Sequence, residues 1–325
     1  MSLQTDSMNT PLPYLYLAPI RGLTDYLLRN IFARHFKGFD AAVAPFINPQ
    51  KKALYDDRML KDVLPANNRI LEVVPQLLHT SPGDFLVLAR RLQDLGYKHI
   101  NWNLGCPAPM VAKKRKGSGL LPYPAAIIEF LEHIFPRLQV ELSIKTRLGF
   151  YDFSELKQLL PLLDQYPLKE IIIHTRLGVQ LYKGETDPDK FFTCLELSRH
   201  QLSYNGDICD LRTYQKLAHQ FPAVRHWMIG RGALKNPFIA EEIKAYPVVP
   251  HQERLRRLNA FHHDLLEQYE QNLSGPGHIL ARTKQLWSYL IFSFPGQEKI
   301  LKKILKCASL EKYRALVEQL FAGAV

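Results

Sequence analysis

The sequence predicts a (β/α)8 barrel followed by a small all-helical domain, and two patterns lead to this fold class. Eight short apolar runs alternate with segments of helical periodicity, at the repeat and total length that such barrels need. Beyond residue 246 the apolar runs stop and helical periodicity alone continues. We therefore expect a barrel domain over residues 1–245 and a helical domain over residues 246–325.

The predicted strands are separated by helical stretches with recognisable caps. Thr24 or Asp25 can cap the helix after the first strand, and Ser81 can cap the helix after the third. The third strand contains Pro75 and is expected to be irregular. An open doubly wound sheet is the alternative, but no GxGxxG motif follows the first strand. The strands are expected at residues 14–19, 39–44, 72–77, 99–105, 142–147, 170–176, 201–206 and 227–231.

The C-terminal part of the chain is predicted to be a small helical bundle. Helical periodicity covers residues 251–272, 276–292, 297–306 and 310–321, and the Gly-Pro-Gly at 275–277 breaks it. Residues 251–325 carry 11 Lys and Arg against 7 Asp and Glu, so this part is itself basic.

The whole chain is basic as well, with a net charge of +11 and a pI near 9.4. Such a charge favours a polyanionic partner, although some proteins are basic without one. Charge alone does not distinguish RNA from DNA or from an anionic membrane.

Cysteine usage and hydropathy indicate a cytoplasmic protein. The four cysteines are Cys106, Cys194, Cys209 and Cys307, and no CxxC or Cys/His spacing appears, so we predict neither disulfides nor a metal site. No apolar run approaches the roughly 20 residues needed to span a membrane. Residues 1–10 lack the basic and apolar regions of a signal peptide.

Polar residues follow nearly every predicted strand at the same end. In a (β/α)8 barrel the functional groups lie at the C-terminal ends of the strands, so these residues should meet around one opening. If these polar residues only faced solvent in loops, they would not be expected at the same end of seven strands. The residues are Arg21 after Pro19 and Ile20, then Gln76, Asn103 with Cys106, Lys145 with Arg147, His174 with Arg176, Asn205 with Asp207, and Arg231.

Strand alternation places two of these side chains inside the barrel. Lys145 shares a strand face with Ser143 and Arg147, so its ammonium should point into the lumen, where it needs an acceptor or an anion. The alternative is a lysine that reaches solvent from the strand edge. His174 follows three isoleucines, and its alternative role is that of a hydrogen-bonded core histidine.

Glycine-containing turns after the last two strands predict a phosphate site. They cover residues 205–207 (Asn-Gly-Asp) and 230–232 (Gly-Arg-Gly), the loops that bind phosphate in many such barrels. Gly206 and Gly230 let backbone N–H groups approach phosphate oxygens, and Arg231 can donate two hydrogen bonds to them. The ring of a phosphorylated cofactor held there would lie near Lys145 and Cys106.

Cys106 lies on a sharp Gly-Cys-Pro turn at residues 105–107. Shortly after it comes a basic run at residues 113–116 (Lys-Lys-Arg-Lys), followed by Gly-Ser-Gly. A weak acid thus stands beside a loop that can attract phosphates. A solvated surface loop is the simpler reading of the basic run.

With these residues in place, the chain resembles the tRNA-dihydrouridine synthases over residues 14 to 320. The motifs that carry the resemblance are specific as a set. They are Ala-Pro-Ile-Arg-Gly at 18–22, Asn-Leu-Gly-Cys-Pro at 103–107, Lys-Gly-Ser-Gly at 116–119, Ile-Lys-Thr-Arg-Leu-Gly at 144–149, Tyr-Asn-Gly-Asp-Ile at 204–208 and Met-Ile-Gly-Arg-Gly-Ala at 228–233.

The resemblance implies an FMN enzyme that uses NADPH to convert a tRNA uridine to 5,6-dihydrouridine. We also expect a monomer, with no metal and no membrane partner. It implies that Cys106 donates a proton to uracil C5 after hydride reaches C6, which suits a thiol with an ordinary pKa of about 8.5. The implied flavin contacts are Pro19, Ile20, Arg21, Gln76, Lys145, His174, Asn205, Gly206, Asp207, Gly230 and Arg231. Asn103 is the implied contact to the uracil, and Arg147 and Arg176 are the implied contacts to RNA.

The C-terminal residues 281–290 most resemble the branch of the family that modifies uridine 16. There we expect Arg282 and Lys284 to contact tRNA. A rotation of about 200° around the helix axis separates their side chains, so they need not contact the same phosphate. The sequence departs from the family pattern at Ile20, where Met is usual, and around His174 and Arg176, where the family usually has His-Gly-Arg-Thr.

Two other functions remain open at this stage. One is a flavin-dependent dehydrogenase of a free pyrimidine, of the dihydroorotate type, which leaves the basic helical domain unexplained. The other is a tRNA-binding protein without redox activity, which leaves Cys106 and Lys145 unexplained.

Overall fold

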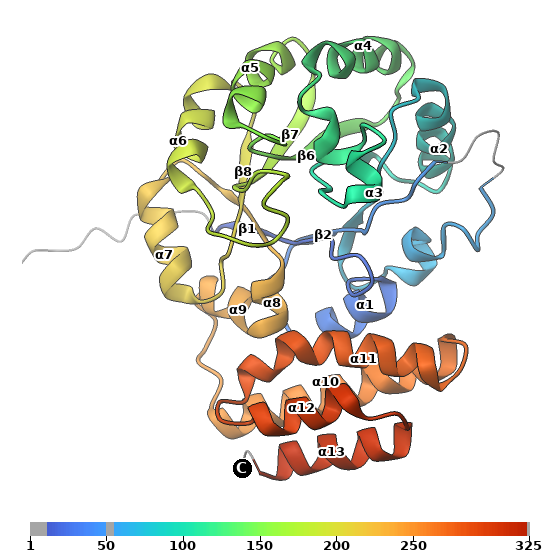
Figure 1. Ribbon diagram of the computed structural model, residues 1–325, viewed down its shortest axis with the longest axis vertical. Helices are drawn as coiled ribbons and strands as arrows, with labels where there is room; N and C mark the ends of the chain where they lie inside the picture. The colour runs from blue at the N-terminus through green and yellow to red at the C-terminus, as the bar shows by residue number, and fades with distance from the viewer. Residues whose placement is uncertain (1–11, 50–54, 324–325) are drawn as a thin grey trace, which may run out of the picture.

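The chain forms a closed parallel barrel with a bundle of helices against one side of it (Figure 1). The structure, a computed structural model, describes residues 12–49 and 55–323; residues 1–10, for which the sequence predicts no signal peptide, lie outside them. The strands are β1 (Tyr14–Leu17), β2 (Ala41–Val43), β3 (Glu72–Val74), β4 (Gln76–Leu77), β5 (His99–Leu104), β6 (Glu141–Arg147), β7 (Leu168–His174), β8 (Leu202–Asn205) and β9 (His226–Ile229).

Pro75 divides the third predicted strand into β3, which pairs with β2, and β4, which pairs with β5. Proline has no N–H and cannot continue a regular ladder. On one side of it, Ala44 N donates to Val74 O at 3.0 Å, and on the other Asn101 N donates to Pro75 O at 2.9 Å. The strand therefore pairs first with β2 and then with β5. The order β3-β2-β1-β9-β8-β7-β6-β5-β4 is thus one ring, which confirms the predicted barrel.

Helices cover the outside of the ring, and five of them begin at a residue whose side chain accepts a backbone N–H. Asp25 accepts a hydrogen bond from Leu28 N at 3.1 Å and caps α1, whereas the Thr24 hydroxyl accepts from Ile20 N at 2.8 Å inside the preceding loop. The α-helices of the barrel are α1 (Tyr26–His35), α2 (Pro82–Asp94), α3 (Pro109–Ala112), α4 (Pro124–Ile134), α5 (Phe153–Leu163), α6 (Pro188–Leu197), α7 (Leu211–Gln220), α8 (Arg231–Lys235) and α9 (Ile239–Ile243). Short 3-10 helices are η1 (Lys61–Val63), η2 (Pro65–Asn67), η3 (Gly117–Leu120), η4 (Phe135–Arg137) and η5 (Ile291–Ser293).

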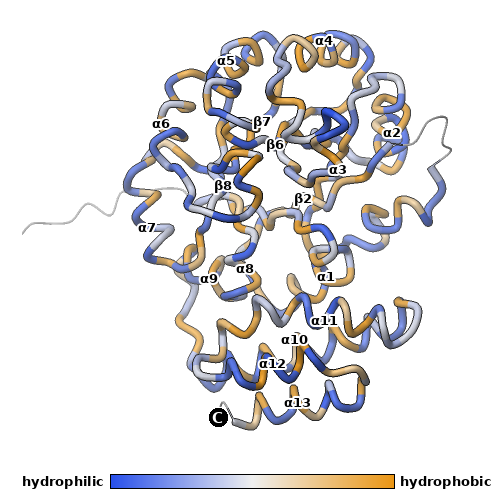
Figure 2. The backbone as a smooth tube through the Cα atoms, in the orientation of Figure 1, coloured by the Kyte–Doolittle hydropathy of each residue, from blue (hydrophilic) through white to orange (hydrophobic). Residues whose placement is uncertain are grey.

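The core has two layers because successive strand residues face opposite sides of the sheet. Outward residues such as Ile144 and Trp102 pack under the helices, where Trp102 stacks on Phe130 at 4.2 Å between ring centroids. Inward residues such as Tyr16 and Met228 fill the lumen. Figure 2 shows the corresponding mixture of apolar and polar positions along the outer helices. The inward residues at the C-terminal ends of the strands line the candidate functional site.

The helical domain consists of α10 (His251–Asn272), α11 (Pro276–Leu290), α12 (Glu298–Lys306) and α13 (Leu310–Ala322). Its buried side chains are continuous with the outer core layer of the barrel, and among them Trp287 Nε1 donates to Tyr313 OH at 2.8 Å. It packs on α1 and α8 of the barrel (Figure 1). The interface is rich in charge, since Arg257 donates to His35 O at 3.1 Å and pairs with Glu241. No helix in the described part of the chain is long and apolar enough to cross a membrane.

Candidate active site

A cavity of about 430 Å³ opens at the C-terminal ends of the barrel strands. Sequence analysis predicted most of its lining. The predicted residues on its wall are Pro19, Ile20, Arg21, Gln76, Asn103, Cys106, Lys145, Arg147, His174, Asn205, Asp207, Gly230 and Arg231. The predicted residues that do not line it are Arg176, Gly206, Arg282 and Lys284.

Lys145 reaches into the cavity from β6, so it does not extend to solvent from a strand edge. Its Nζ donates to Asn205 Oδ1 at 2.9 Å, and Asn205 Nδ2 in turn donates to Met228 O at 2.8 Å, which fixes the amide orientation. Burial, and then the charge of Arg147, lowers the pKa of Lys145 to about 7. This ammonium is thus poorly compensated and suits an anionic ligand.

A chain of amide hydrogen bonds leads to the Cys106 turn. Gln76 Nε2 donates to Asn101 Oδ1 at 2.7 Å, and Asn103 Nδ2 donates to Gln76 Oε1 at 2.7 Å. Asn103 Oδ1 accepts from the backbone N–H groups of Gly105 at 3.0 Å and Cys106 at 2.8 Å. The Asn103 side chain therefore positions the thiol-bearing turn and keeps one N–H for a ligand.

The turn is fixed from its other side by residues 117 and 118. Ser118 Oγ donates to Cys106 O at 3.0 Å, and a Cβ added at Gly117 would lie 2.9 Å from the Cys106 Cβ. Gly117 also has a φ of +57°, which a side chain would disfavour. The Lys-Gly-Ser-Gly motif thus supports the cysteine, while Lys113, Lys114 and Arg115 before it are exposed.

The Cys106 thiol is half-buried and retains its proton at neutral pH. Burial raises its pKa and outweighs the opposing effects of the Ala108 N–H and of the charges of Arg147, Arg21 and Lys145. A raised pKa suits a proton donor and would hinder a nucleophile.

Asp207 contacts two arginines near the Asn-Gly-Asp and Gly-Arg-Gly turns. Its carboxylate pairs with Arg176 and, at 2.7 Å, with Arg231. Burial alone would raise the pKa of Asp207, but hydrogen bonds and charge from both arginines outweigh it and lower the pKa. Arg176 is only 2% exposed and also donates to Gly184 O at 2.8 Å. This placement does not fit the expectation that Arg176 contacts RNA; its role is to hold Asp207, which orients Arg231.

His174 is neutral in this setting. Burial lowers its pKa well below the usual range, and the charges of Arg147, Lys145, Arg176 and Arg231 lower it further. Arg176 Nη1 lies 3.3 Å from His174 Nε2. Since a guanidinium can only donate, Nε2 accepts and the proton lies on Nδ1.

Tyr182 is a cavity residue that sequence analysis missed. Its ring lies under Arg147 at 5.2 Å from centroid to guanidinium carbon, and Arg231 Nη1 donates to its carbonyl at 3.2 Å. Arg147 itself is 1% exposed and donates to Gly105 O at 3.0 Å. Tyr182 belongs to the long loop between β7 and α6, which carries no motif; only the rule that such loops surround a barrel opening could have indicated it.

The helical domain reaches the same cavity through α11. Gln285 and Tyr289 lie on its wall. Arg282 pairs with Asp25 at 2.8 Å, and Lys284 Nζ donates to Cys307 O at 2.6 Å. Both predicted RNA contacts on this helix are thus engaged in internal contacts, and the expectation that they bind tRNA does not fit their placement.

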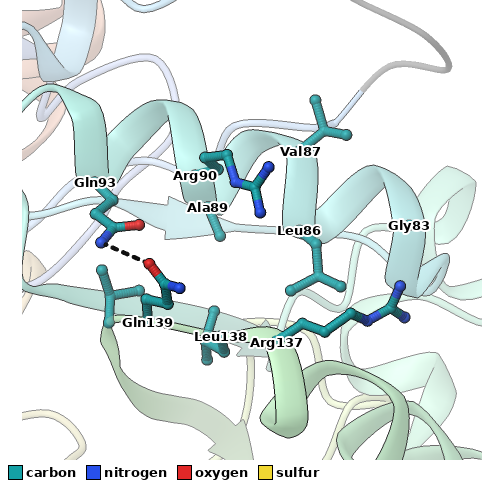
Figure 3. A pocket seen from close by; sticks show the side chains of 10 residues that line it. Gly83, Leu86, Val87, Ala89, Arg90, Gln93, Arg137, Leu138 and Gln139 are labelled. Atoms are coloured by element: carbon teal, nitrogen blue, oxygen red, sulfur yellow. Dashed lines mark hydrogen bonds between the residues drawn. The ribbon is translucent and has the colours of Figure 1, made fainter.

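A second pocket, of about 390 Å³, lies between α2 and residues 137–140 (Figure 3). Arg90 and Arg137 stand at its edges, and Gln93 Nε2 donates to Gln139 Oε1 at 3.3 Å across it. Residue 140 precedes the start of β6, so this pocket is at the opposite end of the barrel from Lys145 and is separate from the active site. Among the described residues no three His, Cys, Asp or Glu side chains gather as metal ligands would.

The fold and the cavity define a (β/α)8 barrel that holds a protonated thiol and a buried lysine of lowered pKa in one cavity. The model of the dihydrouridine synthase (Dus) family matches residues 16–318. The chain therefore belongs to the dihydrouridine synthase family, which confirms the resemblance drawn from the motifs.

Curated relatives agree with this family over nearly their whole length. "Probable tRNA-dihydrouridine synthase 2" of Bacillus subtilis strain 168 is 27% identical over 314 residues, covering 95% of this chain and 94% of the relative. "Probable tRNA-dihydrouridine synthase" of Staphylococcus epidermidis strain RP62A is 26% identical over 315 residues, covering 95% and 94%.

Solved structures agree on the fold alone. Histamine dehydrogenase from Rhizobium sp. 4-9 superposes with a TM-score of 0.55 at 11% identity, over 71% of this chain and 45% of that chain. A 2-naphthoyl-CoA reductase superposes with a TM-score of 0.56 at 9% identity, over 72% of this chain and 50% of that chain. The chain thus spans about half the length of both proteins.

Proposed function

We propose that this protein is an FMN-dependent tRNA-dihydrouridine synthase that uses NADPH to reduce the C5=C6 bond of a uridine in the D-loop of tRNA, namely uridine 16. The names of its curated relatives support tRNA as the substrate. The observation that carries the proposal is that Cys106 and Lys145 line one cavity. The Cys106 thiol keeps its proton because its pKa is raised, and the pKa of Lys145 is lowered because burial, and then the charge of Arg147, disfavours the ammonium.

The cavity residues fit a phosphorylated flavin. Lys145, Gln76 and Arg231 supply donors, and a Cβ added at Gly230 would lie 3.3 Å from the Ala18 Cβ, so glycine keeps that part of the wall open. The chemistry that a flavin would supply in this cavity is hydride transfer to uracil C6, with NADPH as the reductant. Arg231, oriented by Asp207, would hold the phosphate, and Lys145 would balance negative charge on the ring.

Cys106 completes the reduction by delivering a proton to uracil C5. Hydride at C6 and this proton at C5 together add two hydrogens across the double bond, and the thiolate that remains regains its proton from water. Asn103 holds the Cys106 backbone through its Oδ1, and the Nδ2 hydrogen that does not bind Gln76 is available to the uracil edge. The uridine must leave the tRNA stack to reach this position.

Exposed cations offer a path for the tRNA backbone. Lys299, Lys302, Lys303 and Lys306 lie at i, i+3, i+4 and i+7 on α12, so they share one face, and all four are exposed. The opposite face is buried through Ile304. None of the four lysines forms an ion pair within residues 12–49 and 55–323. We propose this lysine face, together with the exposed cations at 113–115, as the tRNA surface, in place of Arg282 and Lys284.

Reversing two of these charges should weaken tRNA binding with little effect on the flavin. We expect Lys302→Glu/Lys303→Glu to raise the dissociation constant for tRNA at least about tenfold, and to lower the slope of log K against log salt by about one for each lysine. The control is Lys157→Glu/Lys216→Glu, which reverses two exposed charges on α5 and α7. Equal affinity of the two double variants would contradict the surface.

The function is tested by incubating unmodified tRNA with the protein, FMN and NADPH and analysing its nucleosides by mass spectrometry. The proposal predicts one uridine heavier by two hydrogens, in the fragment that contains position 16. Modification at another uridine would correct the site, and reduction of free pyrimidines instead of tRNA would favour the dehydrogenase of the dihydroorotate type. We further propose a cytoplasmic monomer; the free state of all four cysteines supports a reducing compartment.

A further inference from the structure

Helix α11 of the helical domain contacts the loop that forms one side of the active-site cavity. The loop connects β1 to α1 and contributes Pro19, Ile20 and Arg21 to the wall. Within the barrel domain it is held by Thr24, which is fully buried; the Thr24 hydroxyl accepts from Ile20 N at 2.8 Å, and the Thr24 carbonyl accepts from Arg29 Nη1 at 2.7 Å. From outside it is held by α11.

Arg282 makes the outside contact with both ends of its guanidinium. Nη1 donates to Gly22 O, and Nη2 donates to Asp25 Oδ2 at 2.8 Å. The other oxygen of Asp25 caps α1. Arg282 thus joins the loop carbonyl and the first cap of the following helix, and it fixes the two ends of the segment 22–25 relative to each other.

The local electrostatics make this contact costly to remove. Burial raises the pKa of Asp25, and Arg282 is the strongest of the groups that counter it, ahead of the Leu28 N–H. The Tyr269 hydroxyl on α10, which is buried without a hydrogen-bond partner among the described residues, has its pKa raised by burial and then by the Asp25 charge. Without Arg282, the buried Asp25 carboxylate would lose its main compensating charge.

Two neighbours of Arg282 continue the same helix face into the cavity. Gln285 and Tyr289 follow at i+3 and i+7, and both line the cavity. Gln285 lies directly on the loop, since a Cβ added at Gly22 would be 3.3 Å from its Oε1, and Gly22 has a φ of +84°. A side chain at this loop position would therefore be disfavoured by both the backbone and the packing.

The helical domain also holds the second cofactor segment. Ser293, in η5 just after α11, donates to Lys235 O at 2.9 Å at the end of α8, the helix that begins with Arg231. The β1–α1 loop and helix α8, which begins with Arg231, are thus both attached to the helical domain.

We propose that Arg282 is a positioning residue for the cofactor site, so that the helical domain shapes the flavin pocket in addition to binding tRNA. Arg282 acts through the loop at 19–22 and does not itself line the cavity. The proposal rests on the proposed flavin enzyme, and it explains why this arginine faces the barrel and not the solvent.

The test measures flavin release from the purified holoenzyme after dilution, by the fluorescence of free flavin. We expect Arg282→Ala to release flavin about tenfold faster than the wild type, the effect of losing one charge-assisted hydrogen-bond pair. Arg282→Lys, which can still reach one acceptor, should recover part of the difference. The control is Arg256→Ala, whose side chain is 75% exposed on α10 of the same domain.

The outcomes separate this proposal from the proposed function. Flavin release from Arg282→Ala at the wild-type rate would overturn the positioning role while leaving the enzyme assignment intact. A wild-type protein that holds no flavin would instead overturn the proposed function. Far-ultraviolet circular dichroism at the assay temperature should match the wild type; a variant that has unfolded there would show Arg282 to be a residue of overall stability and would also overturn the proposal.

Discussion

Replacing Cys106 by alanine should slow the reoxidation of reduced flavin by tRNA about 100- to 10,000-fold, the range that a positioned proton donor contributes. The thiol lies in the cavity with a raised pKa, so it is the acid that the reduction of uracil needs. Stopped-flow absorbance of the flavin under anaerobic conditions measures the rate. Reduction of the flavin by NADPH should be nearly unchanged in the same variant, because that step needs no proton at uracil C5.

The matched control for this prediction is Cys209→Ala. Cys209 is also a half-buried free thiol whose pKa is raised by burial, but it lies outside the cavity wall. We expect the control to react with tRNA at the wild-type rate. If Cys106→Ala reacted as fast as Cys209→Ala, the proton donor would have to be another group.

Replacing Lys145 by methionine should slow both half-reactions by about 100-fold, as expected when a single positioned charge or donor is removed from a buried site. Methionine keeps the volume of the side chain but cannot balance negative charge in the cavity. The variant also loses the 2.9 Å hydrogen bond from Lys145 to Asn205. We expect this loss to affect the rates less, because Asn205 still donates to Met228 O. Lys157→Met, on the exposed face of α5, is the control and should behave like the wild type.

The lowered pKa of Lys145 also predicts a pH dependence of cofactor binding. With a pKa of about 7 in the free protein, the ammonium is present below pH 7 and is lost as the pH rises above it. An anionic cofactor favours the protonated form, so its dissociation constant should rise between pH 7 and pH 9. The same titration of Lys145→Met should be flat over this range; a parallel rise in both proteins would show that another group titrates.

The sequence was sufficient for the barrel and for the residues that stand on its strands. Alternation within β6 placed Lys145 in the lumen, and Asn103 and Cys106 followed from the end of β5. These predictions succeed because the side-chain period of a strand is fixed and because barrels use one end of their strands for function. The division of the third strand at Pro75 also followed from proline chemistry.

Residues on loops and between domains could not be predicted in this way. The contact of Arg282 with Gly22 and Asp25 joins positions about 260 apart, and no local pattern distinguishes it from an exposed RNA-binding arginine. Arg176 pairs with Asp207, which lies on a different loop, and no sequence pattern around either residue indicates this pair. Tyr182 reaches the cavity only through the path of its loop. In each case the decisive partner is set by tertiary packing.

The most direct test of the central claim, that this cavity reduces a uridine of tRNA, is anaerobic. The flavin of the purified holoenzyme is reduced with NADPH, unmodified tRNA is added, and the flavin absorbance is followed. We predict rapid reoxidation that requires tRNA and that is largely lost in Cys106→Ala. A flavin that stays reduced with every tRNA, but is reoxidised by a free pyrimidine, would contradict the claim.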